Sequence, residues 1–313
     1  MANDENYSHQ AVLILAHNHM DQVLKLAEYL LTTFNVYIHI DKKTQLTRTQ
    51  STKMQQMLTD YSGNTTSKNI FKVVSIYDVK WGSYSIVRAT IDLMKLAYRD
   101  QINDQFHLIS GQDWPLKPLN KIYDFYDGND ITYMDYYLTT EKVKSHEPEI
   151  WWVKYYFNYD QVNRRTLFGK IYHRVLLLIQ TIFRVNKLKN TKWNEQQMYA
   201  GKEWIDIPRE ALGVALDQYG SDKELQHIFA TSFCSDEMWL QTVLCNNKNY
   251  HGKVDKNIHR FITEVTKNGH GATPDILTEK YYDEIVNGDA FWGRKFVSPD
   301  SDKLLKLLQK HNN

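Results

Sequence analysis

The chain has 313 residues, of which 42% are hydrophobic and 24% charged, so it can form one large α/β domain or two small ones and is not a disordered protein. Its 38 Lys and Arg residues balance 37 Asp and Glu, and a net charge of +1 provides no general field to hold a polyanion such as DNA. We therefore expect no nucleic-acid partner. Only Cys234 and Cys245 are present, without a C-x-x-C pair, which indicates neither a disulfide framework nor a structural zinc site.

The N-terminal segment, MANDENYSHQAVLILAHNHMDQ, has an acidic start and a six-residue apolar run at 11–16. A signal peptide and a membrane-spanning helix both need a longer apolar core. We therefore expect a cytoplasmic protein. Peripheral contact with the inner face of the plasma membrane is a further option, because of a basic segment in the middle of the chain.

The first third of the chain alternates strand and helix patterns. Strands are predicted at 11–17, 35–41, 70–76 and 105–111, with helices at 20–31 and 85–99. This order predicts the α/β class with a Rossmann-like, mostly parallel central sheet. Such sheets bind ligands at the carboxyl ends of their strands, where His17, Asp41 and the proline-braced stretch HLISGQDWPLKPLN (107–120) lie.

Several ligand classes lack their sequence patterns. No G-x-G-x-x-G follows the first strand and no G-x-x-x-x-G-K-[ST] occurs, which argues against a dinucleotide dehydrogenase and a P-loop enzyme. The 12 His residues form no H-E-x-x-H or H-x-x-E-H pattern, and the D-x-D triplet at 300–302 lies in the tail. We therefore expect no bound metal.

The middle of the chain holds RRTLFGKIYHRVLLLIQTIFRVNKLK (164–189), a basic stretch around an apolar run of five residues at 175–179. It is too short to span a bilayer and predicts a helix with Lys and Arg at its flanks. Such a helix either packs on the domain with its charges in solvent or lies on an anionic membrane surface. The sequence leaves both interpretations open.

Charged residues in the last third are candidates for chemistry. A strand and a helix that begins at Pro208 are predicted over 203–219, and a second helix over 236–247 opens with Asp236 and Glu237. These two acids serve either the electrostatics of a helix end or a reaction. Farther on, Arg294 and Lys295 lie among aromatic residues in AFWGRKFVSPD, which favours cations held against an anion such as a diphosphate over solvated surface charge.

Seven segments, taken in order, resemble the core-2/I-branching β-1,6-N-acetylglucosaminyltransferase family, which also includes the peptide O-xylosyltransferases. They run from about 11 to 296, and the region 141–191 shows no match. The segments are VYIHIDKKT, VKWGSYSIVRATIDLMKLAY, FHLISGQDWPLK, GKEWIDIPREAL, SFCSDEMWLQTVLCN, IHRFI and FWGRKF.

The resemblance implies a GT-A-like fold and an inverting transfer from a UDP-sugar to a hydroxyl of a glycan or lipid-linked glycan, without a divalent metal or other cofactor. The sugar is expected to be N-acetylglucosamine, with xylose or another hexose as alternatives. We expect one domain over 1–313, since no linker or repeat is present. Its parts are a nucleotide-sugar half (11–140), a variable insertion facing acceptor or membrane (141–195) and a catalytic, diphosphate-binding half (196–313).

The resemblance also implies residue roles. Glu237 is expected to be the catalytic base, which takes the proton of the attacking hydroxyl, and Asp41 to lie at the uracil or ribose. Fixed cations stabilise a leaving diphosphate, and this role falls to Arg260, Arg294 and Lys295. The remaining expected contacts are His17, Trp81, Asp113 and Trp114 for the donor, and Asp236 and Trp204 for the acceptor.

Two other function classes stay open. The aromatic clusters YMDYYL and WWVKYYFNYD favour a carbohydrate-binding protein on a degenerate transferase fold, because Tyr and Trp rings stack on sugars. A glycoside hydrolase needs two carboxylates flanking the bond, and no second acid has a defensible position. Since the chain lacks the anchor and disulfide cysteines of animal members of the family, it looks like a bacterial member that acts in surface polysaccharide or glycolipid synthesis.

Overall fold

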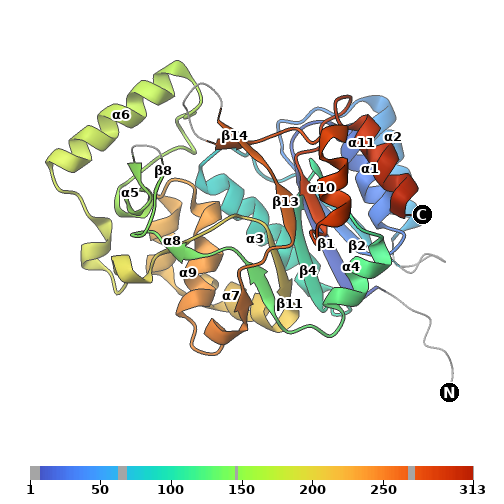
Figure 1. Ribbon diagram of the computed structural model, residues 1–313. Helices are drawn as coiled ribbons and strands as arrows, with labels where there is room; N and C mark the ends of the chain where they lie inside the picture. The colour runs from blue at the N-terminus through green and yellow to red at the C-terminus, as the bar shows by residue number, and fades with distance from the viewer. Residues whose placement is uncertain (1–7, 63–68, 145–146, 267–271, 313) are drawn as a thin grey trace.

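A computed structural model describes residues 8–62, 69–144, 147–266 and 272–312 (Figure 1). Its centre is a seven-stranded sheet with the strand order β12-β6-β11-β4-β1-β2-β3. Strands β4, β1, β2 and β3 run parallel, and β11 is antiparallel to both of its neighbours. The predicted α/β class with a mostly parallel central sheet is confirmed. The strands are β1 (Gln10–Ala16), β2 (Asn35–Ile40), β3 (Phe71–Val74), β4 (Gln105–Ser110), β6 (Thr132–Met134), β11 (Ile205–Pro208) and β12 (Val254–Asp255).

Helices cover both faces of this sheet (Figure 1). Side chains of β1 alternate between the two cores, with Val12 and Ile14 in one and Ala11 and Leu13 in the other, as the two-residue period of a strand requires. The first core lies under α1 (Met20–Leu30), α2 (Arg48–Asp60), α4 (Leu119–Tyr126), α10 (Tyr282–Asn287) and α11 (Asp302–Asn312). The second lies under α3 (Tyr84–Arg99), α7 (Arg209–Ser221), α8 (Lys223–Ala230) and α9 (Trp239–Asn246).

A second, three-stranded sheet with the order β13-β16-β5 lies beside the central one. Its strands are β5 (Asp113–Pro115), β13 (Arg260–Ile262) and β16 (Trp292–Arg294). In the β16–β5 register Arg294 is opposite Asp113. This sheet therefore brings the segment after β4 together with the C-terminal cations.

Short elements complete the described chain. The two-stranded pairs are β7 (Tyr137–Leu138) with β10 (Tyr199–Ala200), β8 (Val143–Lys144) with β9 (Glu147–Pro148), and β14 (Glu264–Thr266) with β15 (Ala272–Pro274). The remaining helices are α5 (Ile150–Lys154), α6 (Leu167–Ile182) and the 3-10 turns η1 (Lys187–Asn190), η2 (Glu195–Gln197), η3 (Ser235–Glu237), η4 (His251–Lys253) and η5 (Glu279–Tyr281). Among the residues that the structure describes, no helix has the length and apolarity needed to cross a bilayer.

Two local predictions were wrong. The predicted helix over 236–247 is divided into the 3-10 turn η3 and helix α9, which starts only at Trp239. The break lies at Met238, whose φ of −138° and ψ of −35° are not helical, and no side chain caps either piece. Helix α2 was not predicted, since it buries only Met57 among its residues.

Candidate functional site

The carboxyl ends of β1 and β2 hold His17 and Asp41, as the sequence predicts. Asp41 Oδ1 accepts hydrogen bonds from the backbone amides of Lys43 (3.1 Å) and Val79 (3.3 Å), so this carboxylate fastens the loop before α3. Partial burial is the largest cause of a lowered pKa at His17, and the Asp41 carboxylate opposes it. Three nearby cations also lower the pKa of His17: Lys295, Arg294 and Arg165.

Arg294 is held in place by buried groups. Its guanidinium donates to Asp113 Oδ1 at 2.8 Å and to the Ser110 hydroxyl, and lies 4.5 Å from the centroid of the Trp204 ring. Asp113 also accepts from the Ser110 backbone amide at 2.7 Å. Asp113 and Trp204 are both buried, and their expected contacts, with the donor and the acceptor respectively, stay predictions. Both residues orient Arg294.

Arg260 does not face an open site either. Its two terminal nitrogens donate to the carboxylate of Asp206 at 2.6 and 2.9 Å, and only 2% of its side chain is exposed. Burial raises the pKa of Asp206, but Arg260 and His107 outweigh burial and hold this pKa well below its usual range. The guanidinium charge is thus paired with Asp206 inside the protein, and the diphosphate contact of Arg260 stays a prediction.

The two Trp residues predicted at the donor have different environments. Trp114 is only 1% exposed and its ring stacks on Tyr29 at 5.7 Å, because β5 joins the small sheet and points this side chain into the core. Its expected donor contact stays a prediction. Trp81 is 47% exposed, packs edge-to-face on Phe233 at 5.4 Å, and has the Arg165 guanidinium 5.1 Å from its ring centroid. Trp81 therefore presents an accessible ring.

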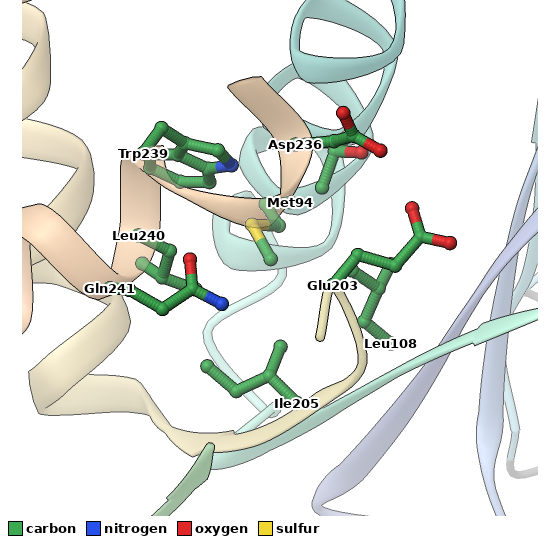
Figure 2. A pocket seen from close by; sticks show the side chains of 9 residues that line it. Met94, Leu108, Glu203, Ile205, Asp236, Trp239, Leu240 and Gln241 are labelled. Atoms are coloured by element: carbon green, nitrogen blue, oxygen red, sulfur yellow. The ribbon is translucent and has the colours of Figure 1, made fainter. Parts of the chain in front are cut away.

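Three carboxyl groups from two segments meet beside Arg294. Asp236 and Glu237 lie in η3, and Glu203 lies two residues before β11. The Gly201 amide donates to the Glu237 carbonyl at 2.9 Å, which ties the two segments together. Figure 2 shows Glu203 and Asp236 at the wall of a small cavity of about 10 Å³, with room for about one water molecule.

The Glu203 and Asp236 carboxyls are hydrogen-bonded to each other. The pKa of Glu203 is raised to about 7. Burial is the largest cause, the Arg294 charge opposes it, and the Glu237 charge adds to it. Burial, followed by the charges of Glu203 and Glu237, raises the pKa of Asp236 well above its usual range. Both shifts favour a proton held by this carboxyl pair. The acceptor contact expected of Asp236 stays a prediction.

Glu203 is the site residue that the sequence analysis missed, although a signal was present. In the sequence, residues 203, 205 and 207 follow a two-residue period, and Ile205 and Ile207 of β11 are core residues. This spacing predicts that the Glu203 side chain faces the same core as the two isoleucines. A buried carboxyl needs a hydrogen-bond or charge partner, which marks Glu203 as a candidate site residue.

Within the described parts of the chain, no group of three or more His, Cys, Asp or Glu side chains has an arrangement that could hold a metal ion. Arg294 ends β16 and Lys295 follows it directly, and Arg294 acts on Glu203 of the carboxyl cluster. The backbone of Lys295 is anchored on both sides, since its amide donates to the Asp275 carbonyl (3.3 Å) and its carbonyl accepts from Leu277 (2.8 Å).

Comparison with known proteins identifies the family of the chain as a whole. The family model described as Core-2/I-Branching enzyme matches residues 11–286, including the region where we found no similar segment. No curated protein sequence matches the chain. A solved structure of the bifunctional glycosyltransferase WbbM, in its apo form, is similar with a TM-score of 0.44 and 10% identity, over 96% of this chain and 47% of that one. This chain thus spans about half of that structure's length. From the extent of the family match, the chain belongs to the Core-2/I-branching enzyme family of glycosyltransferases.

Proposed function

We propose that the chain is an inverting, metal-independent glycosyltransferase that moves a sugar from a UDP donor to a hydroxyl of a glycan or lipid-linked glycan. N-acetylglucosamine is the sugar we test first, with xylose or another hexose as alternatives. One observation carries the proposal: Arg294 acts on Glu203 of the carboxyl cluster and, together with Lys295, on His17, so it joins the cluster to the end of β1.

The chemistry of an inverting transfer needs this arrangement. One carboxylate takes the proton of the acceptor hydroxyl as its oxygen attacks the anomeric carbon, and Glu237 is our choice for this base. The bond to UDP breaks on the opposite face, and negative charge grows on the diphosphate. Arg294 and Lys295 stabilise that charge, and Arg294 needs no reorganisation because Asp113 and Trp204 already hold it.

The residues around this centre supply binding surface. Trp81 offers an exposed ring for stacking on a base or sugar. His17 and Asp41 end adjacent parallel strands, where α/β sheets bind nucleotides. We further propose a cytoplasmic role in bacterial surface polysaccharide or glycolipid synthesis.

The alternative of a non-catalytic carbohydrate-binding protein loses its main support. It depended on aromatic clusters, and in the cluster WWVKYYFNYD most rings form core: Trp152, Tyr155, Phe157 and Tyr159 are buried. These rings pack the second core and are not available to stack on a glycan.

Calorimetric titration with UDP, UDP-GlcNAc, UDP-xylose and UDP-glucose, each with and without EDTA, tests the proposal. We expect binding that survives EDTA and is lost in Lys295→Ala, but kept in Lys303→Ala, whose exposed ammonium pairs with Glu279 on the surface. Glu237→Gln should keep donor binding and lose at least about 100-fold in turnover. Absence of binding by all four nucleotides, from protein shown to be folded, would refute the proposal.

A further inference from the structure

Helix α6 carries most of the exposed apolar surface of the protein. It lies at the outer edge of the molecule, apart from the central sheet (Figure 1). Of the 12 large hydrophobic side chains that are exposed in the described chain, eight belong to α6 and its C-cap, with exposed fractions from 46% to 76%. We call these eight residues the α6 apolar stripe: Leu167, Phe168, Ile171, Val175, Leu178, Ile179, Ile182 and Phe183.

The opposite face of α6 is firmly packed. Its buried residues are Gly169, His173, Leu177 and Gln180, which recur every three or four positions, as one side of a helix does. Both ring nitrogens of His173 are hydrogen-bonded: Nδ1 with the Tyr159 hydroxyl and Nε2 with the Glu147 carboxylate. The α6 apolar stripe is therefore the outward face of an anchored helix and not a frayed end of the chain.

The α6 apolar stripe lies in a segment that has basic residues and no acidic ones. Residues 161–194 contain eight Lys and Arg and no Asp or Glu, while the remainder of the chain has 30 basic and 37 acidic residues, a difference of −7. Within the segment Lys187 is buried and Lys192 pairs with Asp222. Besides Lys192, five of its cations have exposed side chains: Arg165, Lys170, Arg174, Arg184 and Lys189.

We propose that α6 docks the protein on an anionic lipid membrane, with the helix in the plane of the interface and the α6 apolar stripe among the acyl chains. An amphipathic helix with a basic flank binds such surfaces through apolar burial and attraction to anionic headgroups. A second copy of the chain fits this face poorly, since pairing two α6 faces would bring two acid-free, cationic segments together. Nothing in segment 161–194 offers the carboxylates that would relieve that repulsion.

The start of α6 adjoins the candidate active site. Arg165, two residues before the helix, lies over the Trp81 ring, and its charge acts on His17. A membrane-bound α6 would therefore hold the donor end of the site close to the lipid surface. If the proposed transferase activity holds, this placement suits an acceptor glycan carried on a lipid.

Sedimentation with phosphatidylcholine vesicles, with and without phosphatidylglycerol, tests the docking. We expect binding to the anionic vesicles, weakened by about 30-fold or more in Lys170→Glu/Arg174→Glu, since each basic residue near the surface contributes about 1 kcal/mol. The control is Lys95→Glu/Arg99→Glu, an exposed pair with the same spacing on α3, which should bind like wild type.

A second variant tests the apolar contact. Ile171→Gln/Leu178→Gln/Ile182→Gln should also release the protein from anionic vesicles, with circular dichroism and thermal unfolding as checks of folding. Retained binding in both α6 variants, or no binding of wild type, would overturn the proposal. So would a wild-type dimer that this triple variant converts to a monomer without any vesicle binding. Because the assay contains neither donor nor acceptor, its result is independent of the transferase proposal.

Discussion

The substitution Glu203→Gln tests the proton held between Glu203 and Asp236. Glutamine keeps the size and the hydrogen-bonding end of the side chain but has no proton to lose in this pH range. In wild type, burial raises the pKa of Glu203 from 4.5 to about 7. Between these two values the folded state keeps a proton that the unfolded state releases, so the free energy of unfolding falls as pH rises.

The size of this fall follows from the pKa change. At about 1.4 kcal/mol per pH unit, a rise from 4.5 to about 7 corresponds to about 3 kcal/mol. The free energy of unfolding of the variant does not fall in this way, because its glutamine cannot be ionised. We therefore expect similar stability of wild type and Glu203→Gln near pH 4.5, and a variant more stable than wild type by up to about 3 kcal/mol near pH 8.

Urea unfolding at several pH values, followed by tryptophan fluorescence, measures the difference between the two proteins. Groups remote from Glu203 contribute equally to both proteins and cancel, whereas Asp236 loses the Glu203 charge that raises its pKa, which also favours the variant at high pH. Glu284→Gln, at an exposed position on α10, is the matched control and should show no pH-dependent difference from wild type. A variant that stays parallel to wild type from pH 4.5 to 8 would refute the shared proton.

Three further predictions concern stability and ligand binding. Arg260→Ala should cost about 3–5 kcal/mol of unfolding free energy, since it leaves Asp206 buried without its partner. Trp81→Ala should weaken donor binding and change unfolding free energy by less than about 1 kcal/mol, because the ring is largely exposed. Gly201→Ala should destabilise by more than about 1 kcal/mol, since its Cβ would lie 1.9 Å from the Asp135 carbonyl oxygen.

Each of these has a result that contradicts it. Arg260→Ala with intact stability and lost UDP affinity would instead support Arg260 as a diphosphate ligand. Equal UDP affinity in wild type and Trp81→Ala would remove Trp81 from the donor site. For Gly201 the control is Gly220→Ala, where an added Cβ meets no atom within 4 Å, and equal unfolding free energies in the two variants would exclude the steric argument.

The fold was predictable where local patterns and tertiary packing agree. Strand β1 and helix α1 start or end within a residue or so of their predicted limits, because apolar periodicity alone marks buried strands and half-buried helices. Helix α2 lacks that periodicity, and its visible signal is the capping box formed by Thr47 and Gln50. The break before Trp239 could not be predicted, since it depends on the non-helical backbone of Met238, a residue type that ordinarily continues a helix.

The position of the site in the fold was predictable from the sequence, but the ion pairs of its charged residues were not. His17 and Asp41 follow from strand order alone. Whether a cation faces a ligand or the interior depends on its partner, and the carboxylate that binds Arg294 lies 181 residues away in the sequence. Arg260 is likewise paired over 54 residues. A single sequence carries no pattern for such distances, so the partners of Asp113 and Arg260 had to wait for the structure.

The pairings also decide how charge is distributed for the proposed reaction. Four acids gather here, Asp113, Glu203, Asp236 and Glu237, and Asp113 is taken up by Arg294. A proton shared by Glu203 and Asp236 removes one more negative charge from the cluster. If that proton were lost, repulsion within the cluster would make proton uptake by any member easier and its release harder. Substitutions at Glu203 should therefore change the pH dependence of turnover more than its maximum, which separates a positioning role from that of the base.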